Sequence, residues 1–304
     1  MPGGRRIVAD MTDIGEQAKP PFAVLPDPSL LFFGRAQRLG TLMAGHELEP
    51  YLAFLKRLAE IQHGLSTTLP PVSLPPADQI ARALEHGMPP LSRASIEPDA
   101  AMLGTVEQLV SHLALEPLGD APVAAASALQ AALPVNGRDL VTAALRDAAS
   151  PDVAQQVLIL AGLQVHFTRL AAQLEAKDLK PIAHAACPTC GSPPIASTVV
   201  GWPKAYNTRY CTCALCGTMW NVVRVMCVLC GATDGVSFRG IDGQQDTIKA
   251  ETCDTCRGYV KIVYQVNDTA LEPLCDDVAS VGLDMLLAEE GWKRGSQNPF
   301  LLGY

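Results

Sequence analysis

Basic residues are scarce in this sequence. Its 304 residues include 23 Lys and Arg against 31 Asp and Glu, which gives a formal net charge of −8 at pH 7. General binding of nucleic acid depends on a basic face that neutralises phosphates. We therefore do not expect this acidic chain to bind nucleic acid through general electrostatics.

Long apolar segments are also missing. No run of about 18 or more apolar residues, the length that spans a bilayer, occurs in the sequence. The segment from Met1 to Lys19 lacks the apolar core of a secretory or twin-arginine signal, although Arg5 and Arg6 are adjacent. We therefore expect a cytoplasmic protein without membrane insertion. In that compartment thiols stay reduced, and clustered cysteines usually bind metal.

Catalytic signatures are absent as well. The sequence shows no Ser-His-Asp arrangement, phosphate-binding loop or dinucleotide fingerprint, and its six histidines are scattered outside metal-binding motifs. His184 precedes the first cysteine by three residues, where we favour an exposed histidine over a role beside the first cysteine pair. The sequence therefore does not predict an enzyme.

Cysteine, by contrast, is concentrated in one region. All ten cysteines lie between Cys187 and Cys275, and eight of them form four C-x-x-C pairs separated by 22, 10 and 22 residues. A C-x-x-C turn points two sulfurs at one metal ion, and two such turns complete a tetrahedron. The spacing predicts two tetrathiolate metal sites. The first has the ligands Cys187, Cys190, Cys213 and Cys216, and the second has Cys227, Cys230, Cys253 and Cys256.

Glycines follow the second cysteine of each pair closely. Such glycines adopt the left-handed conformation that turns backbone amides toward the sulfurs, and we expect this of Gly191, Gly217, Gly231 and Gly258. A disulfide framework and a thioredoxin-like dithiol are the rival interpretations. The expected reducing compartment disfavours the first, and four pairs in a Gly-rich, β-like region disfavour the second.

Two cysteines stand outside the pairs. Cys211 lies two residues before Cys213, close enough in the sequence to compete with it as a ligand. Cys275 precedes the acidic start of a helix. We interpret both as thiols that bind no metal.

Helical periodicity dominates the chain before the cysteines. Apolar residues recur at spacings of three and four in residues 31–43, 48–61, 102–113 and 123–133, and residues 153–174 are apolar around most of the helix. Gly64 is expected to end the second of these helices, and Pro134 to Gly137 to separate helices. Short connections imply an antiparallel helical domain with residues 153–174 at its centre.

The cysteine region is expected to be β-rich. Strands are predicted at residues 195–200, 222–225, 236–239 and 259–266, and a closing helix at 276–287. The predicted fold is therefore a mainly α N-terminal domain followed by two small rubredoxin-like or zinc-ribbon units and a C-terminal helix. Loss of a paired cysteine should unfold its own unit and spare the helical domain. The expected boundaries are a flexible N-terminal arm at 1–27, a helical domain at 28–176, a linker at 177–186, a first metal unit at 187–225 and a second unit with the closing helix at 226–304.

These motifs resemble the FdhE family of formate dehydrogenase accessory proteins. The similarity rests on C-P-T-C-G-S-P-P from Cys187, the segment R-Y-C-T-C-A-L-C-G-T-M-W-N-V-V-R-V-M-C-V-L-C from Arg209, and K-A-E-T-C-D-T-C-R-G-Y-V-K-I-V-Y-Q from Lys249. It continues with D-D-V-A-S-V-G-L-D at Asp276 and N-P-F-L at Asn298. The helical region resembles the family more weakly, chiefly in P-Y-L-A-F-L-K-R-L-A and the preceding L-F-F-G-R-A-Q-R-L. Cys211 departs from the family pattern.

The resemblance implies a cytoplasmic, chaperone-like protein required for maturation of formate dehydrogenase, whose catalytic subunit it would contact before export. It also implies two rubredoxin-type iron ions, one on each set of four paired cysteines. Four thiolates suit zinc equally well. A rubredoxin-like electron-transfer protein is the alternative function, and a zinc-ribbon nucleic-acid binder is less favoured.

The partner-binding surface and the oligomeric state stay open at this stage. Aromatic residues make up only 5% of the sequence, yet several gather near the first predicted site together with two arginines. These residue types often carry contact energy, but we favour the interpretation that they cover the metal loops. They are Trp202, Tyr206, Tyr210, Trp220, Arg209 and Arg224.

Overall fold

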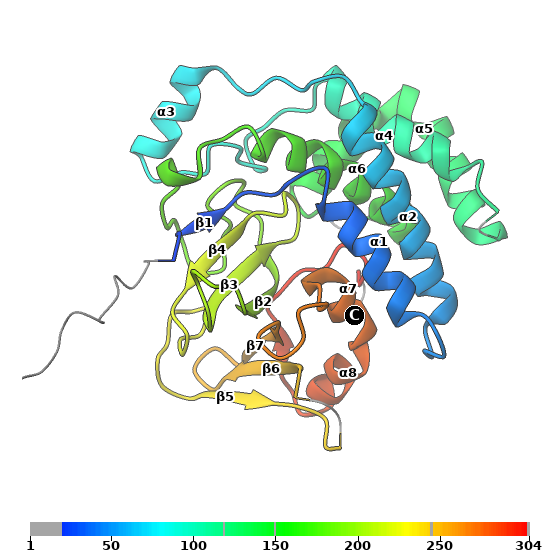
Figure 1. Cartoon of the computed structure of the whole chain (residues 1–304). Helices are drawn as coiled ribbons and strands as arrows, with labels where there is room; N and C mark the ends of the chain where they lie inside the picture. The colour runs from blue at the N-terminus through cyan, green and yellow to red at the C-terminus, as the bar shows by residue number, and fades with distance from the viewer. Residues whose placement is uncertain (1–19, 118, 149, 244–245, 303–304) are drawn as a thin grey trace, which may run out of the picture.

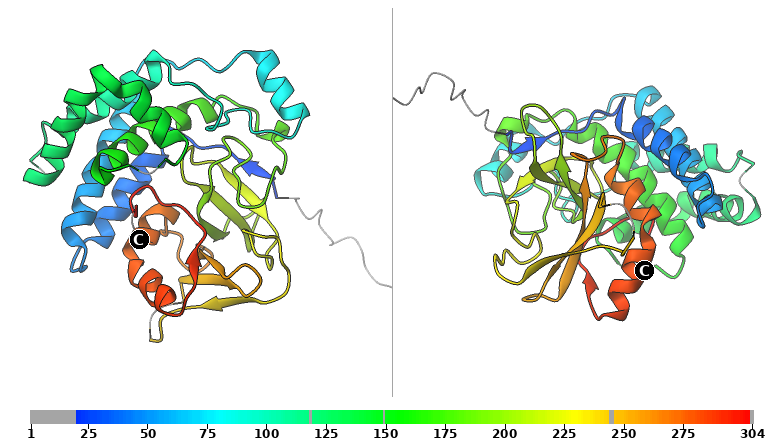
Figure 2. Two further views of the ribbon diagram at one scale, coloured as in Figure 1. Left: turned by 180° about the vertical axis from the view of Figure 1, so that it is seen from behind. Right: turned by 60° about the horizontal axis from the view of Figure 1, so that its bottom comes forward.

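The computed structural model describes residues 20–117, 119–148, 150–243 and 246–302. A helical part covers one side of a mixed β-sheet, and the first of two short helices near the C-terminus lies between the two (Figures 1 and 2). This arrangement confirms the predicted fold class. Most of the expected flexible arm at 1–27 lies outside the described residues. Within its described part, Ala23 and Val24 form a strand that joins the sheet.

Six helices occupy the described residues between 31 and 171. Gly64 does not end the second helix, which continues to Thr68 and stops before two prolines. Pro134 kinks the fifth helix without ending it, and Asn136 alone has non-helical angles there. The third helix was not predicted, because its side chains are not buried in the core. The bounds are α1 Leu31–Leu42, α2 Glu49–Thr68, α3 Ala77–Glu85, α4 Ala100–Leu113, α5 Asp120–Leu145 and α6 Val153–Ala171.

Helix α6 is the centre of the helical part, as its sequence predicts. Nearly every residue from Leu158 to Ala171 is buried. Gly162 permits a close crossing with α4, since a Cβ atom there would lie 2.9 Å from the Cα of Val106. The side chain of Gln62 on α2 donates to the Ala161 carbonyl at 2.9 Å and to Gln164 Oε1 at 3.1 Å. Helix α6 therefore touches helices on two sides and leaves a third side for the sheet.

The strands form one sheet, although two small units were expected. Strands β2, β3 and β4 follow the first cysteine pair, and the second pair lies at the turn between β3 and β4. Strands β5, β6 and β7 follow the third pair, and parallel pairing of β2 with β7 joins the two halves. The order is β1-β4-β3-β2-β7-β6-β5, and β8 pairs with β7. The bounds are β1 Ala23–Val24, β2 Pro194–Val200, β3 Thr208–Cys213, β4 Met219–Val222, β5 Val236–Arg239, β6 Ile248–Cys253, β7 Gly258–Tyr264 and β8 Lys293–Arg294.

Three of the four predicted strands correspond to β2, β5 and β7. The strand predicted at 222–225 is wrong, because β4 ends at Val222 and the residues after it cross between the two halves of the sheet. Strands β3 and β6 were missed. Their sequences T-R-Y-C-T-C and I-K-A-E-T-C carry polar residues at buried positions, so that neither alternation nor a β-branched run marks them.

The predicted closing helix consists of two helices. Helix α7 covers Pro273–Ala279, and α8 covers Val281–Glu289. Between them, the carbonyl and the hydroxyl of Ser280 each accept a hydrogen bond of 3.0 Å from the Lys261 ammonium group. Helix α7 packs on β2 and is tied to α1 by Arg35 with Glu272 and Arg38 with Asp276, at 3.1 and 2.6 Å.

Across the described residues, none of the helices combines the length and apolar character needed to cross a membrane.

Candidate metal centres

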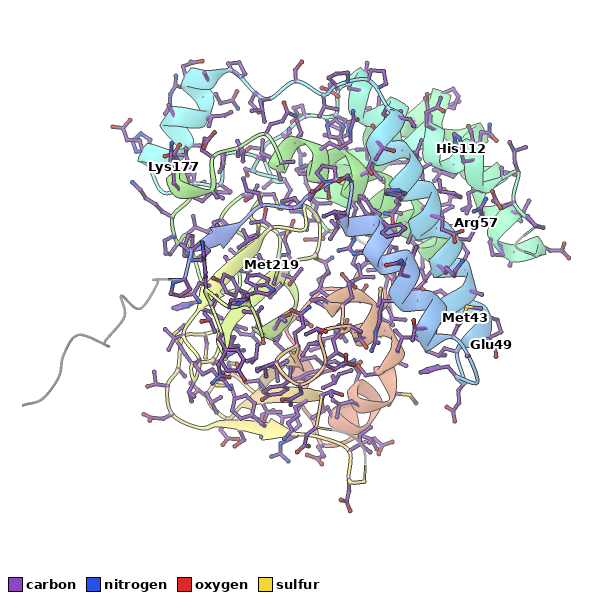
Figure 3. All side chains as sticks on the ribbon, in the orientation of Figure 1. Met43, Glu49, Arg57, His112, Lys177 and Met219 are labelled. Carbon is purple, nitrogen blue, oxygen red and sulfur yellow. The ribbon has the colours of Figure 1, made fainter. Side chains whose placement is uncertain are left out.

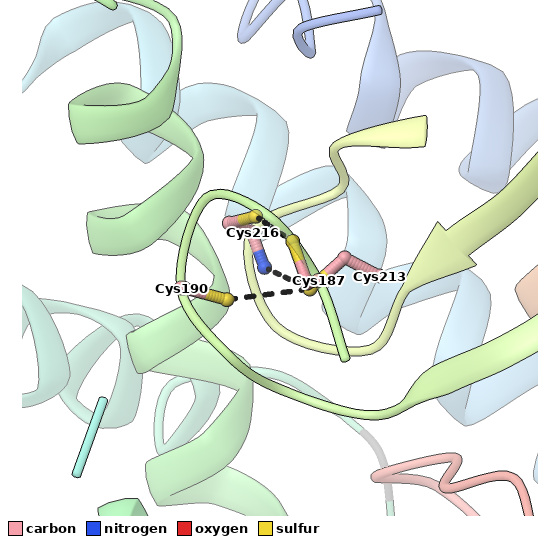
Figure 4. A group of neighbouring side chains, drawn as sticks. All are labelled: Cys187, Cys190, Cys213 and Cys216. Atoms are coloured by element: carbon pink, nitrogen blue, oxygen red, sulfur yellow. Dashed lines mark hydrogen bonds between the residues drawn. The ribbon is translucent and has the colours of Figure 1, made fainter. Parts of the chain in front are cut away.

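The first four paired cysteines come together in one cluster (Figure 4). The Sγ atoms of Cys187 and Cys216 are 3.6 Å apart and those of Cys190 and Cys213 are 3.4 Å apart. A disulfide bond is about 2.05 Å long, so these sulfurs are not bonded to each other. Four sulfurs around one zinc ion, at about 2.3 Å from the metal, would lie about 3.8 Å apart. The donor set and its spacing fit a tetrathiolate ion.

The remaining four paired cysteines form a second cluster of the same kind. Cys227 and Cys256 have their Sγ atoms 3.8 Å apart, and so have Cys230 and Cys253. The sulfurs face each other in the same way as in the first cluster. In both clusters the first cysteine of one turn lies opposite the second cysteine of the other turn. The structure thus brings all eight paired cysteines into the two groups that their spacing predicts.

The two clusters differ in exposure. All four cysteines of the first are completely buried. In the second, Cys230 and Cys256 are exposed while Cys227 and Cys253 are buried. The first cluster is therefore closed to solvent, and the second presents two sulfurs at the surface.

Backbone geometry explains the residues after each second cysteine. Gly191, Gly217 and Gly231 have φ between +76° and +78°, as expected. In the fourth turn the left-handed residue is Arg257, with φ +56°, and the prediction for Gly258 is wrong. Gly258 has a different role, since a Cβ atom there would lie 2.7 Å from Leu229 Cδ1 and 3.3 Å from Cys256 Sγ.

Backbone amides point at the sulfurs in the first cluster. The N–H groups of Leu215 and Cys216 each donate to Cys213 Sγ at 3.3 Å. In the second cluster, burial raises the pKa of the Cys253 thiol, but hydrogen bonds from the Cys256 and Thr255 amides and from neighbouring thiols lower it to about 7. Such hydrogen bonds favour the thiolate, the form that binds a metal.

The first cluster is attached to the helical part on two sides. Gln164 and Thr168 of α6 donate side-chain hydrogen bonds to the carbonyls of Ala214 and Cys216, at 2.8 and 3.3 Å. On the other side the backbone of residues 91–93 binds the first turn, with Leu91 N donating to Thr189 O and Arg93 N to Cys190 O, both at 2.9 Å. An ion at this position would connect the sheet to the helices.

Cys211 and Cys275 belong to neither cluster. Both are completely buried. Burial raises the pKa of Cys211 to about 12 and that of Cys275 well above its ordinary value, which keeps both thiols protonated and unreactive.

His184 lies beside the second cluster. Its imidazole packs against Gly231, the residue after Cys230, where a Cβ atom would come within 2.5 Å of His184 Nε2. The side chain is exposed and is not a member of either group of four cysteines.

The aromatic group near the first site mostly covers the protein interior. Tyr210 and Trp220 are buried, and the Tyr210 hydroxyl donates to the carbonyl of Pro21 at 2.8 Å. Arg209 is buried too, whereas Tyr206 is 67% exposed. Trp220 packs in the same apolar cluster as the first four cysteines, as the interpretation that the rings cover the metal loops expects. Tyr210 packs instead with Val200, Ala205 and Trp202.

Sequence reasoning missed the buried ion pair of Arg209 and Glu251. Arg209 on β3 and Glu251 on β6 are both buried, so the pair joins the two halves of the sheet across β2 and β7. Arg209 also donates to the Met226 carbonyl at 3.2 Å, in the segment that crosses between the halves.

A second buried group of charges fixes α7 and α8 to the sheet. Lys261 on β7 lies 3.2 Å from Asp277 and 2.5 Å from Asp284, and Arg294 pairs with the same two carboxylates. The two cations hold the pKa of Asp277 below its usual value, although burial alone would raise it. The acidic motif from Asp276 to Asp284 was visible in the sequence, but its cationic partners were not.

The fold and the two clusters define the class of protein. It consists of a helical domain joined to a β-sheet that carries two candidate four-cysteine metal sites. The comparison with known families gives a more specific result. The chain belongs to the FdhE family, because models of the FdhE N-terminal, central and C-terminal domains match residues 20–184, 186–224 and 225–301. The resemblance seen in the cysteine motifs is therefore confirmed and extends over the helical domain.

Curated relatives and a solved structure agree with this assignment. The chain is 38% identical to a Protein FdhE homolog of Rhizobium meliloti over 97% of both chains. It is 35% identical to the homolog of Pseudomonas putida, over 93% of this chain and 90% of that one. The crystal structure of the FdhE protein from Pseudomonas aeruginosa superposes with a TM-score of 0.81 at 29% identity, covering 93% of this chain and 99% of that one.

Proposed function

We propose that the protein is a chaperone-like accessory factor for the maturation of formate dehydrogenase, which binds the catalytic subunit in the cytoplasm before export. Membership of the FdhE family along nearly the whole chain is the observation that carries this proposal. In this role the protein is a binding partner of its client and not an enzyme. The client in this proposal is a polypeptide, and a rigid binding surface on the accessory protein loses less conformational entropy when it binds.

Each four-cysteine cluster holds one metal ion in this proposal. Cys187, Cys190, Cys213 and Cys216 are the ligands of the first ion, and Cys227, Cys230, Cys253 and Cys256 are those of the second. The family resemblance favours iron, with zinc as the alternative that the same donor set accepts. A bound ion supplies a rigid cross-link between two turns, worth roughly 10–16 kcal/mol of folding free energy for structural sites of this type.

Deletion of the gene tests the role in maturation. We expect formate oxidation to be lost while the catalytic polypeptide is still synthesised, and the catalytic subunit to co-purify with an affinity-tagged copy of this chain. Formate dehydrogenase of normal activity in the deletion strain would refute the proposal. The metal is identified by elemental analysis of anaerobically purified protein, where we expect two ions per chain in the wild type. One ion is expected after Cys256→Ser.

Electron transfer is a second candidate function, which the exposure of Cys230 and Cys256 favours. Rubredoxin-like iron exchanges electrons with a partner through ligands near the surface. A ferric-thiolate absorbance that bleaches and returns in step with formate dehydrogenase maturation would support it. Full maturation by protein loaded with redox-inactive zinc would eliminate it and leave the chaperone-like role in place.

A further inference from the structure

An apolar groove of about 780 Å³ lies where the helical part meets the C-terminal segment, and no cysteine of either cluster lines it. Its walls are the first turns of α2, α5 and α6, the start of α8 and the segment 300–302. All lining side chains are aliphatic, aromatic or proline, and none is charged; among them are Tyr51, Phe54, Ala125, Val157 and Phe300. The volume falls within the range of roughly 300–1,000 Å³ that is typical of binding pockets.

The groove is a built feature of the fold. The Tyr51 hydroxyl donates a hydrogen bond of 2.6 Å to the Phe300 carbonyl, which holds the C-terminal segment against α2. The rings of Tyr51 and Phe54 stack with their centroids 6.0 Å apart along one wall. Val153 at the start of α6 also lines the groove and is 46% exposed. Segments far apart in the sequence therefore shape one apolar surface.

Three acidic residues adjoin the lining residues along the chain. Glu47, Glu49 and Asp120 are direct sequence neighbours of lining residues and are exposed, and within the described residues their carboxylates make no hydrogen bond or ion pair. Glu49 lies at the first turn of α2 (Figure 3). A fourth acid, Asp152, is used as the cap of α6 and accepts the Gln155 amide at 3.0 Å, so it is not counted here.

No lysine or arginine directly adjoins a lining residue in the sequence. The nearest basic side chains along α2, Lys56 and Arg57, are already neutralised. Lys56 pairs with Glu60 at 2.5 Å, and Arg57 binds Glu60 and Glu116 at 2.7 and 2.6 Å. We call these three carboxylates the rim charges, because each belongs to a residue next to a lining residue in the sequence. They have no basic partner within the described part of the chain, and they favour a cationic ligand.

We propose that the groove binds an amphipathic helix of the partner protein, with the apolar face of that helix in the groove and Lys or Arg residues beside Glu47, Glu49 and Asp120. Recognition of an amphipathic helix by an apolar groove uses large side chains at spacings of three and four as anchors. Complementary charge at the rim sets the orientation and rate of such binding more than its affinity. The proposal rests on the proposed function, because it names the kind of client segment that the accessory protein recognises.

A defined probe tests the groove in the purified full chain. The probe is a fluorescent peptide of about 18 residues, five helical turns, with Leu and Phe on one face and Lys on the other. We expect saturable binding that weakens with salt, and weaker binding of a matched peptide in which Glu replaces Lys. Ala125→Trp fills the groove and should weaken binding at least about tenfold. Ala124→Trp, on the exposed neighbouring position, is the matched control and should change binding less than about twofold.

Reversal of the rim charge provides a second, independent readout. Glu49→Lys with Asp120→Lys should weaken the Lys peptide and strengthen the Glu peptide, whereas Asp139→Lys at an exposed position further along α5 should do neither. Equal binding of the two peptides by the wild type, or no effect of Ala125→Trp, would overturn the proposal. Self-association of the wild type that Ala125→Trp abolishes would also overturn it, by identifying a second copy of the chain as the occupant.

The cellular experiment separates this inference from the proposed function. In a deletion strain the Ala125→Trp variant should fail to restore formate oxidation, while Ala124→Trp should restore it. If both variants restore oxidation fully and the deletion strain lacks it, the groove proposal fails and the maturation role stands. If the deletion strain oxidises formate normally, the maturation role itself fails.

Discussion

The side-chain amide of Gln164 donates a 2.8 Å hydrogen bond to the carbonyl of Ala214, which lies between Cys213 and Cys216. This contact joins the central helix α6 to the turn of the first cysteine cluster, and Thr168 repeats it one helical turn further on. The helical part and the cysteine region look independent in the sequence, but these hydrogen bonds connect them in the structure. The exposed second cluster has no corresponding contact with α6 among the described residues.

The first prediction concerns the loss of one ligand from each cluster. We expect Cys213→Ser to unfold the sheet and loosen the helical part together, because it removes a ligand of the proposed first ion, which would hold the turn that α6 contacts. Cys253→Ser should unfold the second half of the sheet and leave most helical signal intact. Thermal unfolding followed by far-ultraviolet circular dichroism, with metal content measured on the same samples, makes this comparison.

Cys211→Ala is the control for a buried cysteine outside the clusters, and it should retain both ions. Equal loss of helical signal in Cys213→Ser and Cys253→Ser would contradict the prediction. So would a helical part that melts normally in Cys213→Ser, which is the outcome that the sequence alone suggests for any paired cysteine.

The sequence identifies the cysteine clusters because ligand spacing is local information. Each C-x-x-C turn is formed by four consecutive residues, and the long-short-long separation of the turns fixes which pairs meet. Helices α1, α4 and α6 are predictable for a similar reason, since each has an apolar stripe that a single segment displays. The extension of α2 past Gly64 shows the limit, because burial of Leu65 outweighs the cost of one glycine within a helix.

What the sequence does not reveal depends on contacts between distant segments. Arg209 and Glu251 are separated by 42 residues, and nothing near either residue shows that both are buried. Strands β3 and β6 contain these two residues, so they look too polar to be central strands. The unequal exposure of the two clusters is equally invisible, because α6 covers one cluster by a tertiary contact while the turns themselves are alike.

A chelator should remove the two metal ions of the proposed function at different rates. Cys230 and Cys256 are exposed, so a chelator reaches the second ion directly, whereas the first ion becomes accessible only when the surrounding structure opens. We expect two kinetic phases of equal amplitude when a coloured chelator is added to the anaerobic protein. The fast phase should be absent in Cys256→Ser. A single phase, or a fast phase that persists in this variant, would show that exposure does not control release.

The buried charges around Lys261 should be costly to break. The Lys261→Met variant leaves Asp277 and Asp284 with one cation, Arg294, in a buried setting, so we expect a loss of about 3–5 kcal/mol in the free energy of unfolding. Lys249→Met is the control, because Lys249 pairs with the exposed Asp246 and its loss should cost less than about 1 kcal/mol. Urea unfolding measures both differences.

A second substitution tests whether the excess of buried negative charge causes this loss of stability. Asp284→Asn should recover part of the stability lost in Lys261→Met, because the buried group then has one anion for one cation. The effect of Asp284→Asn is compared in the Lys261→Met variant and in the wild type. If it lowers the free energy of unfolding equally in both, the two side chains do not interact energetically.

His166 should make the stability of the helical part depend on pH. Burial on α6 lowers the pKa of this imidazole from its ordinary 6.5 to about 4, and the charge of Arg169 lowers it further while Asp99 raises it. The neutral ring is therefore favoured in the folded state. Its contribution is complete above pH 6.5 and is lost as the pH falls from 6.5 toward about 4, since the unfolded chain takes up the proton first.

The difference between the two pKa values corresponds to roughly 3 kcal/mol of stability lost by about pH 4. Carboxylates titrate in the same range, so the test compares wild type with His166→Gln, which keeps a polar side chain but does not titrate. The variant should lose less stability than wild type between about pH 7 and pH 4.5, as measured by urea unfolding at each pH. Parallel pH profiles for the two proteins would mean that His166 takes up its proton as readily in the folded chain as in the unfolded one, and that burial on α6 does not hold the ring neutral.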